Sequence, residues 1–372
     1  MLNFARTLIA WYLENKRELP WRETSDPYRI WISEIILQQT RVAQGLEYFN
    51  RFMERFPTVT ALAEASEDEV MKYWQGLGYY SRARNLHIAA REIAIRYKGQ
   101  FPTEYEEVLA LKGIGAYTAA AVCSFAWKKP YAVVDGNVYR VLSRFWGIDT
   151  PIDSVAGKKE FAALAQELLD RNRPDLYNQA IMDFGALVCS PKNPDCLYCP
   201  LQEECVARIK GCIDKLPVKG GKTSVKPRYF NYFHLTCRGK TLLRRREEKD
   251  IWQNLYEYPL IETSEVMDFA DLQQTPAYRR LLQGVETVEV KQMVEMPKHV
   301  LSHRIIYAHF YRLEISNFSV AHQLYLQLSD EEIENYAVSR LMELYWEKTG
   351  FSPGYEDGED VYKGKNRRSA LP

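Results

Sequence analysis

The first half of the chain carries its apolar residues at helical spacing. They recur three or four positions apart, as in Phe4, Leu8, Trp11 and Tyr12, which is the pattern of a helix with one buried face. Proline and glycine interrupt these runs at intervals typical of helix ends. The interrupting residues are Pro20, Pro27, Pro57, Gly76, Gly78, Gly99 and Pro102. The pattern predicts a helical bundle with short loops.

Four later helical segments are predicted before the chain changes character. Thr103 is expected to cap a helix that ends near Leu111, and Asp135 stands at the start of a helix that ends near Trp146. Two more helices are expected over residues 158–172 and 175–188. All of them precede a cysteine-rich loop.

The chain beyond residue 228 has strand signals. Residues 229–238 and 241–246 flank Gly239-Lys240, which indicates a hairpin. Strands are also expected over 285–296 and 303–315, and helices over 272–282 and 331–348. This mixture predicts an α+β second domain. The boundaries expected are a helical domain over 1–209, a basic linker over 210–227, the second domain over 228–349, and a disordered tail over 350–372.

Length and charge limit the protein classes that fit. A chain of 372 residues is too long for one typical core, which agrees with two domains. A formal net charge of zero argues against a protein that coats polyanions over its whole surface, but it allows a local basic face. No signal peptide or membrane span is visible, so we expect a cytoplasmic monomer without membrane contact, associated with the nucleoid if bacterial.

Four of the seven cysteines fall between residues 189 and 205. Cys189, Cys196, Cys199 and Cys205 are separated by six, two and five residues. Zinc usually takes its cysteines as two short-spaced pairs, and only the middle pair is short here. The asymmetric spacing favours a [4Fe–4S] cluster held by four thiolates. The alternatives are a zinc site and four unrelated buried thiols.

A glycine-rich turn joins two helical stretches at residues 111–117. Gly113 and Gly115 permit a tight hairpin whose amide groups face an anion at the start of the second helix. This helix-hairpin-helix pattern holds a DNA phosphate without selecting a sequence. A plain helical hairpin is the simpler alternative, but Asp135 follows twenty residues after Gly115, and that pairing favours a functional site.

Together these features resemble the helix-hairpin-helix DNA glycosylases with an iron–sulfur loop, and among them the adenine DNA glycosylases of the MutY type. The resemblance covers nearly the whole of residues 2–347. Its motifs are Leu19-Pro20-Trp21-Arg22, Trp31-Ile32-Ser33-Glu34, Leu37-Gln38-Gln39-Thr40, Gly76-Leu77-Gly78-Tyr79-Tyr80, Val134-Asp135-Gly136-Asn137, the hairpin and the cysteines. It implies a mainly α glycosylase domain of two helical subdomains plus the iron–sulfur loop, followed by an α+β Nudix-like C-terminal domain.

The resemblance also implies a reaction and its cofactors. The expected enzyme removes adenine from double-stranded DNA where adenine faces 8-oxoguanine or guanine, without cutting the strand. A [4Fe–4S] cluster is the expected cofactor, and a monovalent cation at the hairpin is a further candidate. The Nudix-like domain shows no Glu-rich hydrolase motif, so it is expected to bind DNA and to hydrolyse nothing.

Two carboxylates are the expected catalytic pair. Glu34 lies in an apolar helical run, where desolvation would raise its pKa and keep a proton for adenine N7. Asp135 lies at a helix start, where N–H groups favour the ionised form that suits a developing positive sugar. By the simpler interpretations, Asp135 is only a helix cap and Glu34 only a surface residue. The resemblance adds Tyr117 near both carboxylates and Asn137 as a residue that orders the site.

Other residues match positions that contact DNA in the family. Gln39, Leu77 and Tyr79 match residues that wedge into the stack once the adenine is flipped out, and Thr40 matches one that touches the opposite base. Trp21 and Arg22 match the lining of the adenine pocket. In the second domain Ser302 and His303 match residues that inspect 8-oxoguanine, while Leu301 stands where the family often has Phe, so the intercalating ring is missing.

Two other functions stay open on the sequence alone. An endonuclease III-like glycosylase/lyase would need an amine near Asp135; those enzymes carry a lysine where this chain has Tyr117, and Lys112 is the only amine in the hairpin. The third hypothesis is a non-enzymatic, cluster-bearing protein that binds DNA or senses redox state.

Overall fold

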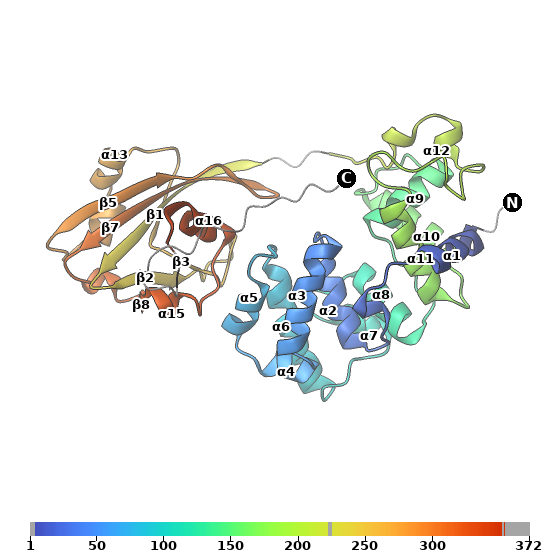
Figure 1. Cartoon of the computed structure of the whole chain (residues 1–372), viewed down its shortest axis with the longest axis horizontal. Coiled ribbons are helices and arrows are strands. Elements are labelled where there is room, and N and C mark those ends of the chain that lie inside the picture. Colours follow the sequence, from blue (N-terminus) through green and yellow to red (C-terminus); the bar gives the residue numbers. More distant parts are fainter. Residues whose placement is uncertain (1–3, 222–224, 352, 354–372) are drawn as a thin grey trace. The chain divides into compact units, whose positions relative to one another are not determined.

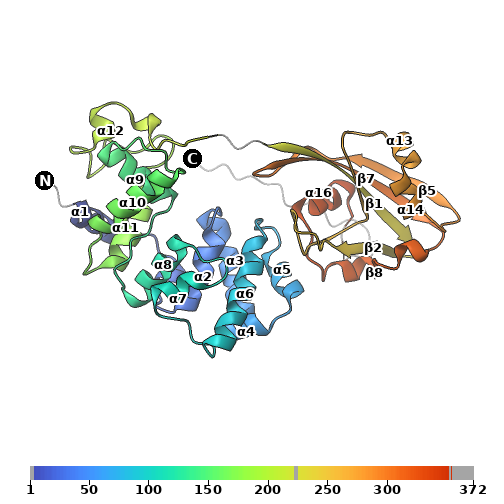
Figure 2. The ribbon, with the colours of Figure 1, turned by 180° about the vertical axis from the view of Figure 1, so that it is seen from behind.

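A computed structural model describes residues 4–221, 225–351 and 353 of the chain. The chain forms two compact units (Figures 1 and 2). The first consists of residues 1–66 and 81–222, and the second combines residues 67–80 with the chain from 223 onward. The segment 67–80 therefore groups with the C-terminal half and not with its sequence neighbours.

The first unit is helical. Its elements are α1 (Phe4–Asn15), η1 (Pro20–Arg22), α2 (Pro27–Leu37), α3 (Val42–Arg55), α4 (Val59–Glu64), α6 (Ser81–Arg96), α7 (Tyr105–Ala110), α8 (Ala116–Trp127), α9 (Gly136–Trp146), α10 (Val155–Leu168), α11 (Pro174–Leu187), α12 (Val206–Ile209) and η2 (Ile213–Lys215). A core formed by Leu8, Leu142, Phe161 and Phe184 binds α1, α9, α10 and α11 together.

Helices α2 and α8 pack against each other and are buried along most of their length. Such helices need apolar residues on nearly every side, and both sequences meet that demand. Glu34 on α2 and Tyr117 on α8 nevertheless lie among these apolar residues. These two helices therefore give the candidate site a rigid apolar frame.

Most predicted helices are present, with three differences. The helix predicted over 331–348 is two helices, Asp330–Ile333 and Arg340–Thr349, because Ser339 caps a new helix at Arg340. Helix α7 begins after Glu104, and the Thr103 hydroxyl donates to the Glu104 carboxylate at 3.3 Å instead of capping the helix. The prediction of Thr103 as N-cap is therefore wrong. The helix predicted over 272–282 is two short helices, because Thr275 caps a new helix at Pro276.

The second unit contains one mixed sheet and short helices. Its elements are α5 (Glu67–Trp74), β1 (Lys226–Cys237), β2 (Lys240–Arg245), β3 (Tyr256–Glu257), β4 (Leu260–Thr263), α13 (Phe269–Gln274), α14 (Pro276–Leu281), β5 (Val288–Glu295), β6 (His299–Val300), β7 (Arg304–Ile315), η3 (Val320–His322), β8 (Leu326–Ser329), α15 (Asp330–Ile333) and α16 (Arg340–Thr349). The sheet order is β3-β2-β1-β7-β5, with β4 beside β1, β6 beside β7 and β8 beside β2.

The sheet holds a core on each face. Strands β1 and β7 run parallel, from Lys226 opposite Arg304 to Thr236 opposite Glu314. One face packs against α16 through residues such as Phe310 and Tyr345, and the other against α13 and α14. The predicted hairpin is confirmed, because Thr236 pairs with Thr241 in antiparallel register.

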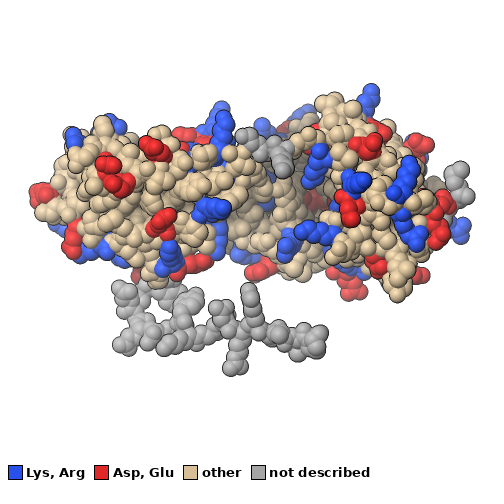
Figure 3. Space-filling view, turned by 90° about the horizontal axis from the view of Figure 1, so that it is seen from above, with Lys and Arg blue, Asp and Glu red and all other residues tan. Residues whose placement is uncertain are grey.

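The segment predicted as a basic linker is partly ordered. It contains η2, and the Ile152 amide donates to the Val218 carbonyl at 3.0 Å. Of the predicted disordered tail, residues 352 and 354–372 lie outside the described residues. Within the described ranges, no helix is long and apolar enough to cross a membrane. Acidic and basic side chains are interspersed on the face seen in Figure 3, which agrees with the net charge of zero.

Candidate active site

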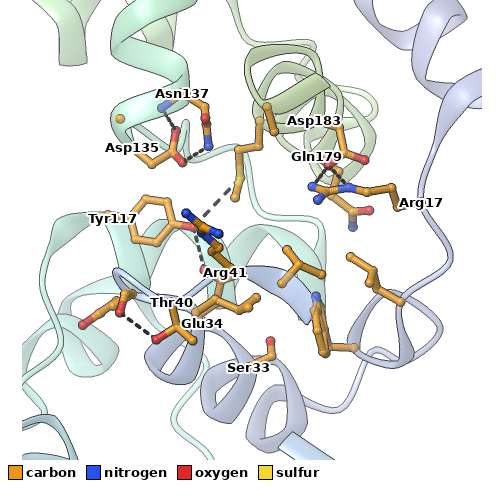
Figure 4. Close-up of a pocket in the computed structure, with 18 of the residues that line it drawn as sticks. Arg17, Ser33, Glu34, Thr40, Arg41, Tyr117, Asp135, Asn137, Gln179 and Asp183 are labelled. Atoms are coloured by element: carbon orange, nitrogen blue, oxygen red, sulfur yellow. Dashed lines mark hydrogen bonds and ion pairs between the residues drawn. The ribbon is translucent and has the colours of Figure 1, made fainter. Parts of the chain in front are cut away.

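A pocket of about 990 Å³ lies in the first unit, between α2, α8, α9 and α11. Glu34, Tyr117, Asp135 and Asn137 line it together (Figure 4). Other predicted residues also line it: Trp21, Arg22, Gln39 and Thr40. Residues that the sequence spreads over more than one hundred positions therefore meet around one cavity.

Glu34 faces this pocket from α2, a helix whose residues are mostly apolar. Its carboxylate accepts a hydrogen bond from the Tyr117 hydroxyl at 2.6 Å. Burial raises the pKa of Glu34 to about 7, and the negative charge of Asp135 adds to this rise, while the Tyr117 bond and the Arg22 charge oppose it. The predicted desolvation of Glu34 is confirmed, and the group can hold a proton near neutral pH.

Asp135 is the N-cap of α9, as predicted. Its carboxylate accepts from the amides of Asn137 and Val138 at 2.9 and 2.8 Å, and from the Asn137 side chain at 2.7 Å. These bonds favour the charged form, but burial outweighs them and raises the pKa of Asp135 above its ordinary value. The prediction that the helix amides dominate the pKa of Asp135 is therefore wrong, because the effect of burial on that pKa is larger.

A glycine on α11 allows this cap to lie deep in the fold. A Cβ atom on Gly185 would be 2.6 Å from the Asn137 Cβ atom, closer than any side chain tolerates. Helices α9 and α11 therefore approach each other at a point where only glycine fits. This contact fixes the backbone that carries Asp135 and Asn137.

Arg140 connects the cap to the cysteine loop. Its guanidinium donates to Asn137 Oδ1 at 2.8 Å and to the carbonyls of Gly185 and Cys189, each at 2.6 Å. Asn137 thus lies between Asp135 and a buried arginine. Arg140 was not predicted from the sequence, although its place one turn after Asn137 on the same helix was the available signal.

Asp183 forms the opposite wall with two arginines. Its carboxylate is fully buried and accepts from Arg22 at 2.6 and 2.8 Å and also from Arg17. Burial would raise the pKa of Asp183, but these hydrogen bonds outweigh it and lower the pKa below the ordinary value. Arg22 was predicted at the pocket, whereas Asp183 and Arg17 were missed. An aspartate on the buried side of α11 was the signal for this pair.

The hairpin between α7 and α8 has the predicted form. Gly113 has a φ of 78° and its missing Cβ atom would lie 2.5 Å from Asn85 Cβ, so glycine is required there. Gly115 is the N-cap of α8, and both glycines are exposed. The amides at the start of α8 can therefore face an anion from solvent.

The C-terminal end of α2 is held by Arg82 of α6. One guanidinium nitrogen, Nη1, donates to the carbonyls of Ile35, Ile36 and Gln38 at 2.7, 3.1 and 2.6 Å. Gln39 follows with a φ of 56°, the left-handed conformation. The end of the helix that carries Glu34, and the turn that carries Gln39 and Thr40, are thus positioned by one side chain.

The four cysteines of the loop are close enough to influence each other. Burial raises the pKa of Cys199 to about 12, and the charges of Cys189, Cys205 and Cys196 raise it further. The Arg144 guanidinium lies 3.5 Å from Cys189 Sγ and donates to the Ser190 carbonyl at 2.8 Å. Across the described ranges, no three ligands converge tightly enough for a single metal ion. These four neighbouring thiols are the residues of the loop that could hold a metal centre.

The predicted DNA-contacting residues of the second unit lie in two loops. Leu77 is buried, while the Tyr79 side chain is 49% exposed and has a φ of 46°. Ser302 and His303 are exposed between β6 and β7. The Tyr79 and Ser302 hydroxyls are 2.8 Å apart, so the structure brings these two predicted residues together. Leu301 is half-buried against the sheet core.

Comparisons with known proteins agree with this architecture. Residues 32–170 match the family described as HhH-GPD superfamily base excision DNA repair protein, and residues 231–348 match the NUDIX domain. An adenine DNA glycosylase of Buchnera aphidicola (subspecies Acyrthosiphon pisum) is 34% identical over 263 residues, which cover 70% of this chain and 75% of that protein. The adenine DNA glycosylase of the Baizongia pistaciae subspecies is 30% identical over 322 residues, 86% of this chain and 88% of its own.

A solved structure shares the helical fold. The structure of a thermostable thymine-DNA glycosylase matches with a TM-score of 0.52 at 30% identity, covering 56% of this chain and 95% of the other. The fold and the pocket therefore define the class: a base excision DNA repair protein of the helix-hairpin-helix superfamily with a NUDIX-like second domain. Within that class the chain belongs to the adenine DNA glycosylases, hydrolases of N-glycosyl bonds.

Proposed function

We propose that this chain excises adenine opposite 8-oxoguanine or guanine in duplex DNA, using Glu34 as general acid and Asp135 as the stabiliser of the sugar cation. The observation that carries the proposal is that both carboxylates line one pocket while their surroundings differ. Glu34 is bonded to one phenol, whereas Asp135 accepts three N–H groups. Two carboxyl groups with different environments are what glycosidic hydrolysis requires.

The adenine must leave the duplex before it can react. Its glycosidic bond is out of reach inside the stack, so the nucleotide is flipped into a pocket, at a cost of about a few kcal/mol that a distorted pair lowers. The cavity of about 990 Å³ is large enough for a nucleoside and its sugar. Trp21 and the Arg22–Asp183 pair also line the pocket and would offer a ring and a fixed polar group to the base.

Glu34 then supplies the proton that makes adenine a leaving group. With a pKa of about 7 the carboxyl is half protonated near neutral pH, which is the best compromise for a general acid. The Tyr117 hydroxyl orients the carboxylate through its 2.6 Å bond. Protonation at N7 weakens the bond between adenine and deoxyribose, and positive charge develops on the sugar.

Asp135 stabilises that positive charge as the ionised carboxylate. The amides of Asn137 and Val138 and the Asn137 side chain fix both of its oxygens, so no reorganisation is needed when the charge appears. Asn137 itself is held by Arg140. In one variant of this step Asp135 captures the sugar covalently for a moment, and water then releases it.

The lyase alternative lacks its nucleophile in the pocket. No lysine is present among the described residues that line it, and Lys112 is exposed on the hairpin outside that lining. The position that would supply the amine is Tyr117, which bonds Glu34. These contacts support a monofunctional enzyme.

The four loop cysteines would hold a [4Fe–4S] cluster. The mutual influence of their thiols and the neighbouring Arg144 fit a centre with four thiolate ligands and net negative charge. When bound, such a cluster supplies a rigid structural centre for the loop. Arg140 and Arg144 on α9 hold that loop beside the helix that begins at Asp135.

The DNA would be held outside the pocket by exposed groups. The hairpin with Gly113 and Gly115 faces a phosphate, Gln39 and Thr40 lie at the pocket rim, and Tyr79, Ser302 and His303 meet the strand that carries the opposite base. Leu77 is buried in the structure, so its wedging would require the turn to rearrange on DNA. A monovalent cation at the hairpin stays a prediction.

Single-turnover base release tests the function. Duplexes with adenine opposite 8-oxoguanine, guanine, cytosine and thymine should be cleaved at their glycosidic bond fastest for the first two, and borohydride should trap no adduct. Glu34→Gln should lower release about 10³-fold while binding persists. Glu160→Gln, an exposed change on α10, is the matched control. Undiminished turnover by Glu34→Gln would remove Glu34 from its role, and a trapped adduct would favour the lyase.

A further inference from the structure

Residues 67–80 are joined to the NUDIX-like sheet by polar contacts at both ends. This segment consists of α5 and a turn formed by residues 75–80. We call this turn the wedge turn, because it carries Leu77 and Tyr79. The wedge turn has three positive φ angles, 91° at Gly76, 73° at Gly78 and 46° at Tyr79. A non-glycine residue such as Tyr79 keeps this backbone conformation only where the surrounding structure holds it.

Glu67 at the start of α5 makes the first anchor. Its carboxylate accepts from Arg245 Nη2 at 3.0 Å and from the Asn254 side chain. Asn254 itself has a φ of 67° and its amide donates to the Arg246 carbonyl at 2.7 Å. Next to Glu67, the Asp68 carboxylate accepts from the Tyr256 hydroxyl at 3.1 Å.

Gln75 and Tyr80 make the second anchor. The Gln75 amide donates to Glu343 at 2.6 Å and accepts from the Val338 backbone N–H at 3.3 Å. The Tyr80 hydroxyl donates to the Val338 carbonyl at 3.3 Å. The wedge turn is therefore tied down on both sides of Tyr79, by partners more than 150 residues away in the chain.

The result of these anchors is the meeting of Tyr79 and Ser302. Both residues are exposed, and their hydroxyls are 2.8 Å apart although 223 positions separate them. A single exposed hydrogen bond is too weak to hold two loops together. The anchors at Glu67 and Gln75 add to the positioning of the two loops.

We propose that Glu67 is a positioning residue that sets the preference of this enzyme for 8-oxoguanine over guanine opposite adenine. Through Arg245 and Asn254 it fixes α5 on the sheet, and so presents the Tyr79 ring and the Ser302 hydroxyl to DNA as one preformed element. Preformed contacts gain affinity because less conformational entropy is lost on binding. This inference rests on the proposed function, in which Ser302 meets the 8-oxoguanine.

Loss of the contacts made by Glu67 should affect one duplex substrate more than the other. Once Glu67 no longer holds α5, Ser302 and Tyr79 no longer meet the DNA together, and the contact that is specific to 8-oxoguanine weakens. The pocket with Glu34 and Asp135 does not include Glu67. Adenine opposite guanine should therefore lose less than adenine opposite 8-oxoguanine, so the ratio of the two rates falls.

The test compares single-turnover rates on the two duplexes for the full-length protein. Glu67→Arg, which opposes Arg245, should lower the ratio of the 8-oxoguanine rate to the guanine rate about tenfold, the worth of a charge-assisted hydrogen bond. The double variant Glu67→Arg with Arg245→Glu exchanges the charges and should restore the ratio. Glu67→Gln, a milder change, should give an intermediate ratio. Glu334→Arg, an equal change of charge at an exposed position of the same unit, should leave it unchanged.

Each alternative result has a definite meaning. Equal losses on both duplexes, or a lowered ratio that the charge exchange leaves unrestored, would overturn the proposal, because Glu67 would then serve the fold alone. A wild-type protein that releases adenine from neither duplex would instead overturn the proposed function, and this inference with it. Thermal unfolding of each variant identifies a change that merely prevents folding, and Glu67→Gln then decides.

Discussion

The pocket lined by Glu34 and Asp135 differs from the wedge turn in how far its polar groups are exposed to solvent. In the pocket, Glu34 is buried and Asp135 is half-buried, and hydrogen bonds from Tyr117 and Asn137 hold them in place. At the wedge turn, Tyr79 and Ser302 are exposed and share a single hydroxyl contact. The pocket changes the properties of its groups, raising the pKa of both carboxyls, while the wedge turn mainly controls where its groups lie.

This difference shows why the two tasks occupy different environments. Protonating a base requires a dry surrounding in which charge is costly, so every polar atom there needs a fixed partner. Contact with a base pair that arrives from solvent requires groups that are reachable, and their position must come from anchors behind them. Substitutions in the pocket should therefore strongly alter the rate or the stability, and those at the wedge turn should alter specificity with little change in stability.

Asp135→Asn should give the largest effect and separates the charge of this residue from its capping role. Asparagine caps helices as well as aspartate does, so the unfolding temperature should change little. Loss of the negative charge should lower single-turnover adenine release about 10³-fold. Ser154→Ala, which removes the cap of α10, should do the reverse, costing about 1 kcal/mol of unfolding free energy with the rate unchanged. A fully active Asp135→Asn would reduce Asp135 to a helix cap.

Asp183→Asn should give the next effect, on stability. The change leaves the guanidiniums of Arg22 and Arg17 without their buried counter-charge, which should cost about 3 kcal/mol of unfolding free energy. Because the folded pKa of Asp183 is lowered, the wild-type advantage should be present above the ordinary pKa and vanish in strong acid. Chemical denaturation at several pH values measures it. Glu104→Gln breaks an exposed ion pair with Lys129 and should leave stability nearly unchanged; equal losses in both variants would contradict the prediction.

The pH dependence of adenine release should report Glu34. With a pKa of about 7, the protonated acid becomes scarce above that pH, and the single-turnover rate should fall toward about tenfold per pH unit. The Tyr117 hydrogen bond lowers the pKa of Glu34, so Tyr117→Phe should shift this alkaline limb to higher pH. A limb that stays in place would show that another group controls it.

The Glu34 carboxyl should also affect stability. Its effect on the free energy of unfolding should be opposite in sign to that of a salt-bridged acid. The pKa of Glu34 in the folded protein exceeds the ordinary value of 4.5. Its ionisation therefore does not affect stability below pH 4.5, and it lowers the free energy of unfolding as the pH rises toward and past 7. Glu34→Gln should therefore raise the unfolding free energy above pH 7, by on the order of 3 kcal/mol.

Ser302→Ala tests the exposed residues near the wedge turn and should give the smallest effect. The side chain is exposed, so unfolding should change by less than about 0.5 kcal/mol. Loss of one hydrogen bond to 8-oxoguanine should lower the rate on that duplex about fivefold and leave the guanine duplex nearly unaffected. Ser264→Ala, at another exposed serine of the second unit, is a matched control. A Ser302→Ala variant with full preference would place recognition elsewhere in the second domain.

Local sequence signals determined much of this protein. The apolar run around Glu34 predicted a buried helix, the Asp135-Gly136-Asn137 motif predicted the start of α9, and Gly239-Lys240 predicted the β1–β2 hairpin. These features depend on residues a few positions apart, through caps, turns and helical periodicity. Such interactions form within a short segment, so their residue types are visible in the sequence.

Only the tertiary structure decided which residues of distant segments contact each other. The Arg22–Asp183 pair, the Arg140 links to the cysteine loop and the Tyr79–Ser302 contact join residues that the chain separates by 161, 49 and 223 positions. The same holds for the pKa of Asp135, because the cap is local but its burial comes from helices packed around it. Which groups are buried together is a property of packing, and packing is set by the whole chain, so no local pattern could supply it.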